Sequence, residues 1–246
     1  MVDDRNEPLL GSAVATSRDR REALLVMGVL VVAFAITAPL ARSRVPAIPQ
    51  FVPIYDTAIL VLDALAAVML YAQFEHLHRR SLLLLVCAYV FTPLVIAAHA
   101  LSIPNAYVTG IVLGGEQSAA WLWVAWHAVF PVFIGVYAVM AHRETAHAVV
   151  SDAAWRRTGT IALIGTVALA LAVVAVVTVG DAVMPPLMRG DTQYSRVTTL
   201  VLALTLLLHL AALGALVWYT RLRRVIDAGL RSFSSRLSSM SCLAQC

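Results

Sequence analysis

The stretch FVPIYDTAILVLDALAAVMLYAQF, residues 51–74, decides the fold of this chain. It is a long apolar run whose only charged residues are Asp56 and Asp63. A run of about 20 apolar residues crosses the ~30 Å hydrocarbon core of a bilayer as an α-helix. Backbone polar groups in lipid must be hydrogen-bonded within their own segment, so the stretch predicts a transmembrane helix.

Five further runs of similar length have the same character, at residues 23–41, 81–102, 119–141, 158–180 and 198–219. The alternating ten-residue pattern of an outer-membrane barrel is absent from the sequence. The fold class predicted is therefore all-α, a polytopic membrane protein with six transmembrane helices. The first run follows a 22-residue segment with five acidic residues, which indicates a retained anchor rather than a cleaved leader.

The composition supports the same class. Hydrophobic residues make up 61% of the 246 residues, charged residues make up 13%, and the mean hydropathy is +0.83. Soluble domains contain about 45–50% apolar and about 25% charged residues. These values exclude a soluble enzyme, a disordered chain and a nucleic-acid module. The net charge of +4 comes from arginines in short segments between the apolar runs, so no nucleic-acid partner is expected.

The distribution of arginine predicts the orientation. If the N-terminus is cytoplasmic, 14 of the 18 basic residues lie in cytoplasmic segments. This bias predicts a multi-pass protein of the inner (plasma) membrane with both termini in the cytoplasm. The predicted organisation is a cytoplasmic segment at 1–22, a six-helix membrane domain at 23–219 and a basic cytoplasmic tail at 220–246.

Three ionisable residues are expected at similar depth near the outer ends of their spans. At about 1.5 Å per residue, Asp56 lies about 8 Å, His99 about 5 Å and His127 about 12 Å from the outer end. Trp123 precedes His127 by one helical turn. Ionisable groups in lipid are costly and usually face the bundle interior. Three interpretations stay open: a structural hydrogen-bond network, a ligand-sensing pocket open to the outside, and a metal or haem site.

A second pair is expected near mid-bilayer, where Asp63 of the second span and Tyr89 of the third reach similar depth. A hydrogen bond between them would couple the two helices. No phosphate-binding loop, nucleophile elbow or HExxH motif occurs, so no enzymatic activity is expected. Besides a redox protein using His99 and His127, a small transporter remains an alternative, although paired repeats and broken helices are not evident. The residues alone identify no cofactor.

The region from residue 51 to 137 resembles the fourth type of the MASE group of bacterial membrane-associated sensor domains. The resemblance covers about a third of the chain strongly, while the last two spans agree mainly in hydropathy. The residues that carry it are Pro53, Asp56, Asp63, Gln73, Arg79, Arg80, Tyr89, His99, Pro104, Trp121, His127, Pro131 and Tyr137.

The resemblance implies a sensory input module whose last helix leads into a cytoplasmic output domain, commonly a diguanylate cyclase or a histidine kinase. Cyclic di-GMP signalling is thus implied by resemblance alone. About 27 residues follow the last span, which is too few for either output. The expectation is a stand-alone or truncated sensor that acts on a separate cytoplasmic output protein.

The basic tail has apolar residues at heptad spacing, at Ile226, Leu230, Phe233, Leu237 and Met240. Such a seam is typical of a short coiled coil and predicts a homodimer through the tail. Its arginines would equally hold the tail on the anionic lipids of the inner leaflet. Membrane lipids and a second copy of the chain are therefore both expected partners.

Overall fold

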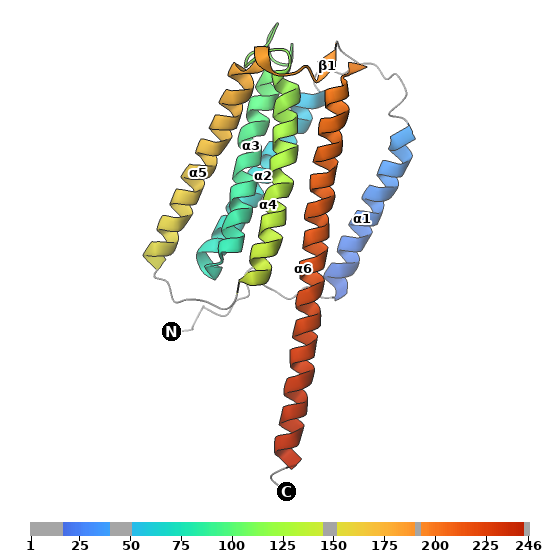
Figure 1. Cartoon of the computed structure of the whole chain (residues 1–246), viewed down its shortest axis with the longest axis vertical. Helices are drawn as coiled ribbons and strands as arrows, with labels where there is room; N and C mark the ends of the chain where they lie inside the picture. Colours follow the sequence, from blue (N-terminus) through green and yellow to red (C-terminus); the bar gives the residue numbers. More distant parts are fainter. Residues whose placement is uncertain (1–16, 40–50, 145–151, 190–192, 244–246) are drawn as a thin grey trace. The chain divides into compact units, whose positions relative to one another are not determined.

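Five long helices form the part of the chain from Gln50 to Cys246, which is one of two compact units; the other is Met1–Pro49. The computed structural model describes residues 17–39, 51–144, 152–189 and 193–243, with the backbone alone from 220 onward. The five helices are α2 (Phe51–Leu77), α3 (Arg80–Ser102), α4 (Ser118–Arg143), α5 (Asp152–Val179) and α6 (Arg196–Leu243) (Figure 1).

All five helices are long and apolar enough to cross a membrane. They correspond to the predicted spans from 51 to 219, and α5 begins six residues before its predicted span because Asp152–Arg157 is helical but polar. Exposed leucines and valines cover the outer faces of α2, α5 and α6. Helices that are apolar all round are typical of membrane spans, so these faces are suited to lipid. The chain is a polytopic helical membrane protein.

Helix α3 lies at the centre of this unit. In its most apolar window 56% of the residues are buried, against 11–17% in the other four helices. It packs against α2, α4 and α5, and α4 also packs against α6. The core at its middle contains Phe91, Ile96, Leu122 and Trp126, all almost fully buried.

The connection between α2 and α3 is a sharp turn at His78. Its backbone has φ +49°, and its N–H donates to the carbonyl of Phe74 at 2.9 Å. A residue in the left-handed region commonly ends a helix in this way. The turn is only two residues long, so α2 and α3 are antiparallel neighbours.

Two longer connections lie at the opposite end of the bundle. One runs from 103 to 117 and contains Asn105, Gly110 and Gly114, all with positive φ. The other holds the short helix η3 (Asp181–Val183) and an antiparallel pair of two-residue strands, β1 (Met188–Arg189) and β2 (Gln193–Tyr194). Successive helices of the unit run in opposite directions. The start of α2, the end of α3 and the starts of α4 and α6 therefore lie at this same end.

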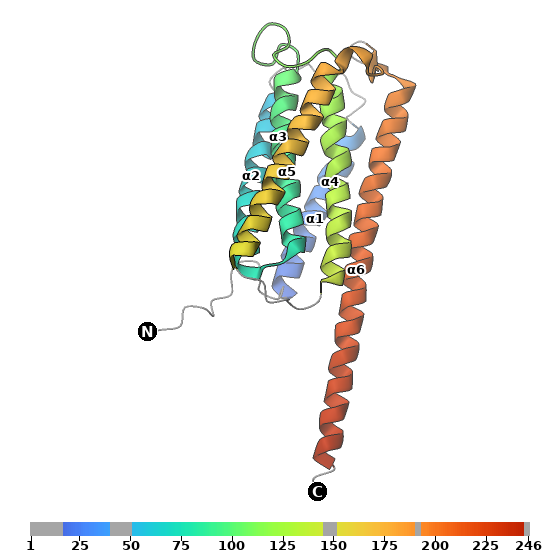
Figure 2. The ribbon, with the colours of Figure 1, turned by 60° about the vertical axis from the view of Figure 1, so that its left-hand side comes forward.

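Helix α6 is 48 residues long and passes without interruption through the predicted boundary at 219/220. Its second half projects past the ends of the other helices of its unit, which is clear in both ribbon views (Figure 2). The tail predicted at 220–246 is therefore helical as far as Leu243. The side chains of the predicted heptad seam lie outside the described residues.

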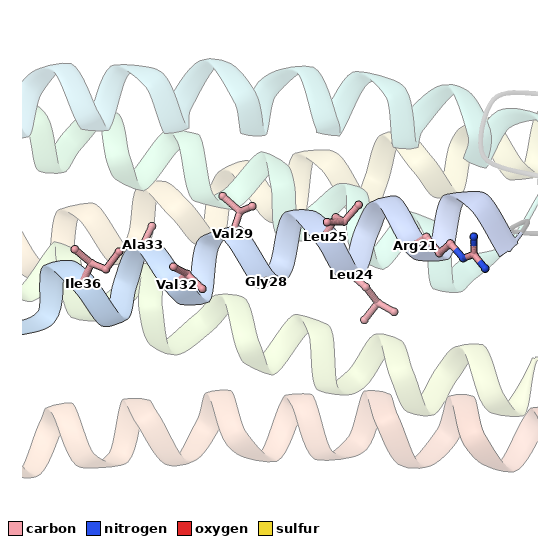
Figure 3. Close-up of a pocket in the computed structure, with 8 residues that line it drawn as sticks. All are labelled: Arg21, Leu24, Leu25, Gly28, Val29, Val32, Ala33 and Ile36. Atoms are coloured by element: carbon pink, nitrogen blue, oxygen red, sulfur yellow. The ribbon is translucent and has the colours of Figure 1, made fainter.

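The unit Met1–Pro49 contributes one described helix, α1 (Ser17–Thr37). Its apolar part, Leu24–Thr37, is shorter than the predicted span at 23–41, and residues 40–50 lie outside the description, as does most of the predicted segment 1–22. Figure 3 shows Arg21 near the start of α1 and apolar side chains such as Leu25 and Val29 along it. The hollow there is lined by α1 alone and contains no polar cluster.

Candidate functional site

A cavity of about 540 Å³ opens at the end of the bundle where α2, α4 and α6 begin. Helix α2 packs on α3 and α6 packs on α4, so the cavity lies where these two pairs of helices face each other. Its wall is mostly apolar and aromatic. The lining residues are Phe51, Val52, Tyr55, Asp56, His99, Ile103, Ala119, Ala120, Trp123, Val124, Leu187, Thr198, Val201 and Leu202.

The structure joins Asp56 and His99 in this wall. Pro53 stands in the first turn of α2, where a proline suits the helix start, and Asp56 follows on the next turn. His99 is in the last turn of α3. The imidazole Nδ1–H donates to Asp56 Oδ2 at 2.7 Å, and both side chains are more than nine-tenths buried. Burial of a carboxylate in lipid requires such a partner.

This pair leaves two hydrogen-bonding atoms open. Asp56 Oδ1 is buried, and within the described part of the chain neither this oxygen nor His99 Nε2 has a hydrogen-bond partner. Since buried polar atoms are nearly always paired in native structures, an open carboxylate oxygen beside a cavity calls for an explanation. A bound molecule with a hydrogen-bond donor would supply one.

His127 is engaged elsewhere and does not line the cavity. Its Nδ1–H donates to the carbonyl of Trp123 at 2.7 Å, and its Nε2 accepts from Trp126 Nε1–H at 3.1 Å. Both ring nitrogens are therefore satisfied within α4, which fixes the tautomer with the proton on Nδ1. The sequence hypothesis grouped Asp56, His99 and Trp123 with His127. The structure places the first three in the cavity wall and His127 outside it.

Aromatic rings connect His127 to the cavity. Its ring stacks on Trp123 at 3.9 Å between centroids and on Trp126 at 4.7 Å. The edge of Trp126 in turn meets His99 at 5.3 Å. His127 is therefore a packing neighbour of the cavity wall, through its direct contact with Trp123 and through Trp126.

The metal hypothesis finds no matching geometry in the described chain. Among the described residues, no three His, Cys, Asp or Glu side chains are grouped to hold a metal ion. His127 and His209 are 6.4 Å apart between ring centroids, and each donates its Nδ1–H to a carbonyl of its own helix. Ligation by His127 Nε2 would break its bond with Trp126.

Asp63 and Tyr89 lie two turns deeper in the bundle. The ring of Tyr89 meets Phe130 of α4 edge-on at 5.4 Å between centroids. Within the described residues no hydrogen bond joins Tyr89 to Asp63, which is only partly buried. The ring contact of Tyr89 is therefore with α4.

A polar clasp at the cavity end was not foreseen from the sequence. Asp181 of η3 accepts from the backbone N–H of Gln117 at 3.1 Å and from Ser118 Oγ at 2.6 Å. The side chain of Gln117 accepts from the N–H of Leu187 at 2.9 Å. Asp181 thus caps the N-terminus of α4 from a distant segment. Gly115 is needed here because a Cβ atom would collide with the Asp181 carboxylate.

The same clasp ties the cavity rim to α6. Leu187 lines the cavity, its carbonyl accepts from Thr198 Oγ1, and it also accepts from the N–H of Ser195 at 3.1 Å. Trp121 Nε1 donates to the carbonyl of Pro185 at 3.1 Å. The only sequence signal for this arrangement was the presence of Ser, Thr, Asp and Gln in loops, which does not say which residues pair.

Comparison with known proteins decides the family. The chain matches MASE4, described as a membrane-associated sensor, integral membrane domain, over residues 46–245. It belongs to the MASE4 family. The resemblance inferred from residues 51–137 is therefore confirmed, and the match extends it through α5 and α6. No curated protein and no solved structure matches the chain.

The limits of the MASE4 match agree with the division of the structure. The matched region begins at residue 46 and the larger compact unit begins at Gln50, so the match covers α2 to α6 and does not extend to α1. The chain is a membrane-associated sensor domain, and the family it matches is a sensor family rather than a catalytic one.

Proposed function

We propose that this MASE4 chain detects a small molecule in the cavity of α2, α3, α4 and α6 and transmits its presence through α6. The observation that carries the proposal is the Asp56–His99 pair, bonded at 2.7 Å in the wall of a cavity of about 540 Å³. The pair is buried, polar and incompletely satisfied, as expected of a binding site and not of a simple anchor.

Helix α6 connects the cavity to the segment that extends beyond the helix bundle. Thr198, Val201 and Leu202 of α6 line the cavity, and the same unbroken helix continues to Leu243. A ligand shifts such an element only if it binds one of two arrangements more tightly. Contact with the α6 wall would give the ligand that difference in affinity, and a non-enzymatic input role follows.

The proposal includes six spans, with α1 as the first, and both termini in the cytoplasm of a bacterial inner membrane. It is supported by the arginine bias and by the cavity lying at the end of the bundle opposite the α6 extension. The cavity then opens toward the outer side. Cysteine labelling tests this in a chain freed of its three native cysteines.

In that labelling experiment, Val108→Cys and Glu75→Cys are matched probes at opposite ends of the bundle, and both positions are exposed. An impermeant maleimide should label Val108→Cys in intact cells and Glu75→Cys only after permeabilisation. The reverse pattern would contradict the orientation.

The partners proposed for the extension of α6 are a cytoplasmic output domain or protein of the cyclase or kinase type, a second copy of the chain, and inner-leaflet lipids. Asp63 and Tyr89 are proposed to transmit movement between α2, α3 and α4. The Tyr89–Phe130 ring contact supports that role for Tyr89.

The decisive test is a fusion of the full chain to a diguanylate cyclase output placed after residue 246. Asp56→Ala and His99→Ala should each change the cyclase output at least about fivefold, the lower range of typical coupling between sites. His127→Ala should change it less, because His127 reaches the cavity only through rings. The measurement is cyclic di-GMP per unit of membrane-inserted fusion.

His209→Ala is the matched control, since His209 is exposed and its hydrogen bond, among the described residues, is to the carbonyl of Thr205 on its own helix. It should leave the output unchanged. Unchanged output with normal expression for all of the Asp56, His99 and His127 variants would reject the assignment of the cavity as the sensing site.

A further inference from the structure

We propose that the cavity takes an apolar molecule bearing a hydrogen-bond-donating head, an amine or an alcohol, which sits against the open atoms of the Asp56–His99 pair. This inference rests on the proposed function and specifies its ligand class. The two open atoms are Asp56 Oδ1 and His99 Nε2, and their arrangement determines which chemistry fits.

Asp56 Oδ1 is a hydrogen-bond acceptor, because a carboxylate oxygen only accepts. His99 uses its Nδ1–H for Asp56 Oδ2, and in the neutral form of the ring its Nε2 accepts as well. A ligand head with donors can satisfy the carboxylate oxygen, while a head with acceptors alone cannot.

The charge of the lining residues also favours a head that donates hydrogen bonds. Asp56 is the acidic residue among the described lining side chains, and none of these described side chains is an arginine. An anionic head would be buried near a carboxylate without an arginine from the described wall to pair with it. Such an arrangement is strongly unfavourable in a medium of low polarity, so fatty acids and phosphates do not fit this wall.

The body of the ligand follows from the remaining lining residues. Phe51, Tyr55 and Trp123 provide aromatic faces, and Val201 and Leu202 provide an aliphatic side. Ala119 and Ala120 leave room along α4. A compact aromatic or aliphatic body with a single polar head matches a wall that is apolar except at one point.

A matched set of phenylbutyl compounds tests the head group. 4-Phenylbutylamine, 4-phenylbutan-1-ol, 4-phenylbutyrate and butylbenzene share one body and differ in the head. Each is titrated by calorimetry into the full chain in lipid nanodiscs, with empty nanodiscs as the control for partition into lipid. The amine and the alcohol should bind saturably and at least about tenfold more tightly than the acid and the hydrocarbon.

Three variants locate the binding. Asp56→Asn should weaken the amine at least about tenfold, whereas Glu75→Gln, a carboxylate change near the other end of the same helix and outside the cavity wall, should leave it unchanged. Ala120→Trp fills the cavity from α4 and should abolish saturable binding of both donors. Circular dichroism of each variant verifies that the helices are retained.

Equal binding of the amine and the acid, an unchanged amine affinity in Asp56→Asn or Ala120→Trp, or no saturable binding of either donor would overturn the ligand class. The fused cyclase separates this failure from that of the proposed function. If the amine and the alcohol bind as expected but the amine does not change the cyclase output, the sensing role is wrong. If Asp56→Ala changes the cyclase output but the four compounds bind with equal affinity, the ligand class is wrong.

Discussion

The two ends of the five-helix unit are held together by different forces. At the cavity end, segments far apart in sequence are joined by hydrogen bonds through Asp181, Gln117 and Thr198. At the far end, beside the turn at His78, rings pack closely: Phe74 meets Trp155 edge-on at 5.7 Å, and His78 stacks on Trp155 at 5.4 Å.

The difference assigns different roles to the two ends. Close ring packing leaves little freedom, because a packed core deforms only at a cost. The cavity end has an open volume of about 540 Å³, against about 250 Å³ beside Phe74 and Trp155, and its rim is held by hydrogen bonds, which can exchange with a ligand or with water. We therefore expect changes at the far end to reduce stability most and changes at the cavity end to alter the response to ligand most.

The largest loss of stability is expected for Phe74→Ala. The ring is 1% exposed and packs against Tyr71 and Trp155, and Gly159 leaves space for its edge. Its removal leaves a cavity and should lower the free energy of unfolding by about 3 kcal/mol. Denaturation in mixed micelles measures this.

Leu62→Ala, at a position 65% exposed on the same helix, is the control for Phe74→Ala and should cost less than about 0.5 kcal/mol. Equal losses in the two variants would mean that the far end is not the packed one.

Asp181→Ala should come next, at about 2 kcal/mol, because two hydrogen bonds to one carboxylate oxygen are lost and the N-terminus of α4 is uncapped. Hydrogen exchange should rise at residues 115–120 and stay unchanged near His78. Asp181→Asn keeps an acceptor oxygen and should lose less than half as much. Exchange rising equally at both ends would argue against a separate clasp.

Glu144→Ala tests a polar cap at the far end. The carboxylate accepts from the N–H of Arg80 at 2.6 Å and from Ser81 Oγ at 2.5 Å, and so caps the start of α3. Its loss should cost about 1 kcal/mol, less than the loss of the ring of Phe74. Glu144→Gln should recover part of this. A cost above that of Phe74→Ala would reverse the proposed order of forces.

The smallest effect is expected for Tyr89→Phe, between the two ends. The ring contact with Phe130 is kept, and only a hydroxyl is removed. Polar contacts between membrane helices are worth about 0.6 kcal/mol on average, so stability should change by no more than that. A large loss in unfolding measurements would show that the hydroxyl of Tyr89 has a stronger partner than the ring contact suggests.

Hydropathy and the length of the apolar runs were enough to predict the membrane-spanning parts of α2 to α6. An apolar segment of about 20 residues in lipid satisfies its own backbone hydrogen bonds only as an α-helix. Helical rise alone brought Asp56 and His99 to one level, and the structure joins them. The direction of His127 could not be predicted, since the rotation of α4 depends on its neighbours and not on its own sequence. Asp181 was missed because its partners lie 63 and 64 residues away.

Because α6 is one unbroken helix from Arg196 to Leu243, its two halves share a single rotational phase. One residue inserted after Tyr219 would turn everything beyond it by about 100° and advance it by about 1.5 Å, whereas seven would nearly restore the original facing. A partner of the far half of α6 therefore depends on the rotation of the helix as well as on its length. A series of insertions of increasing length should change the output with the period of the helix.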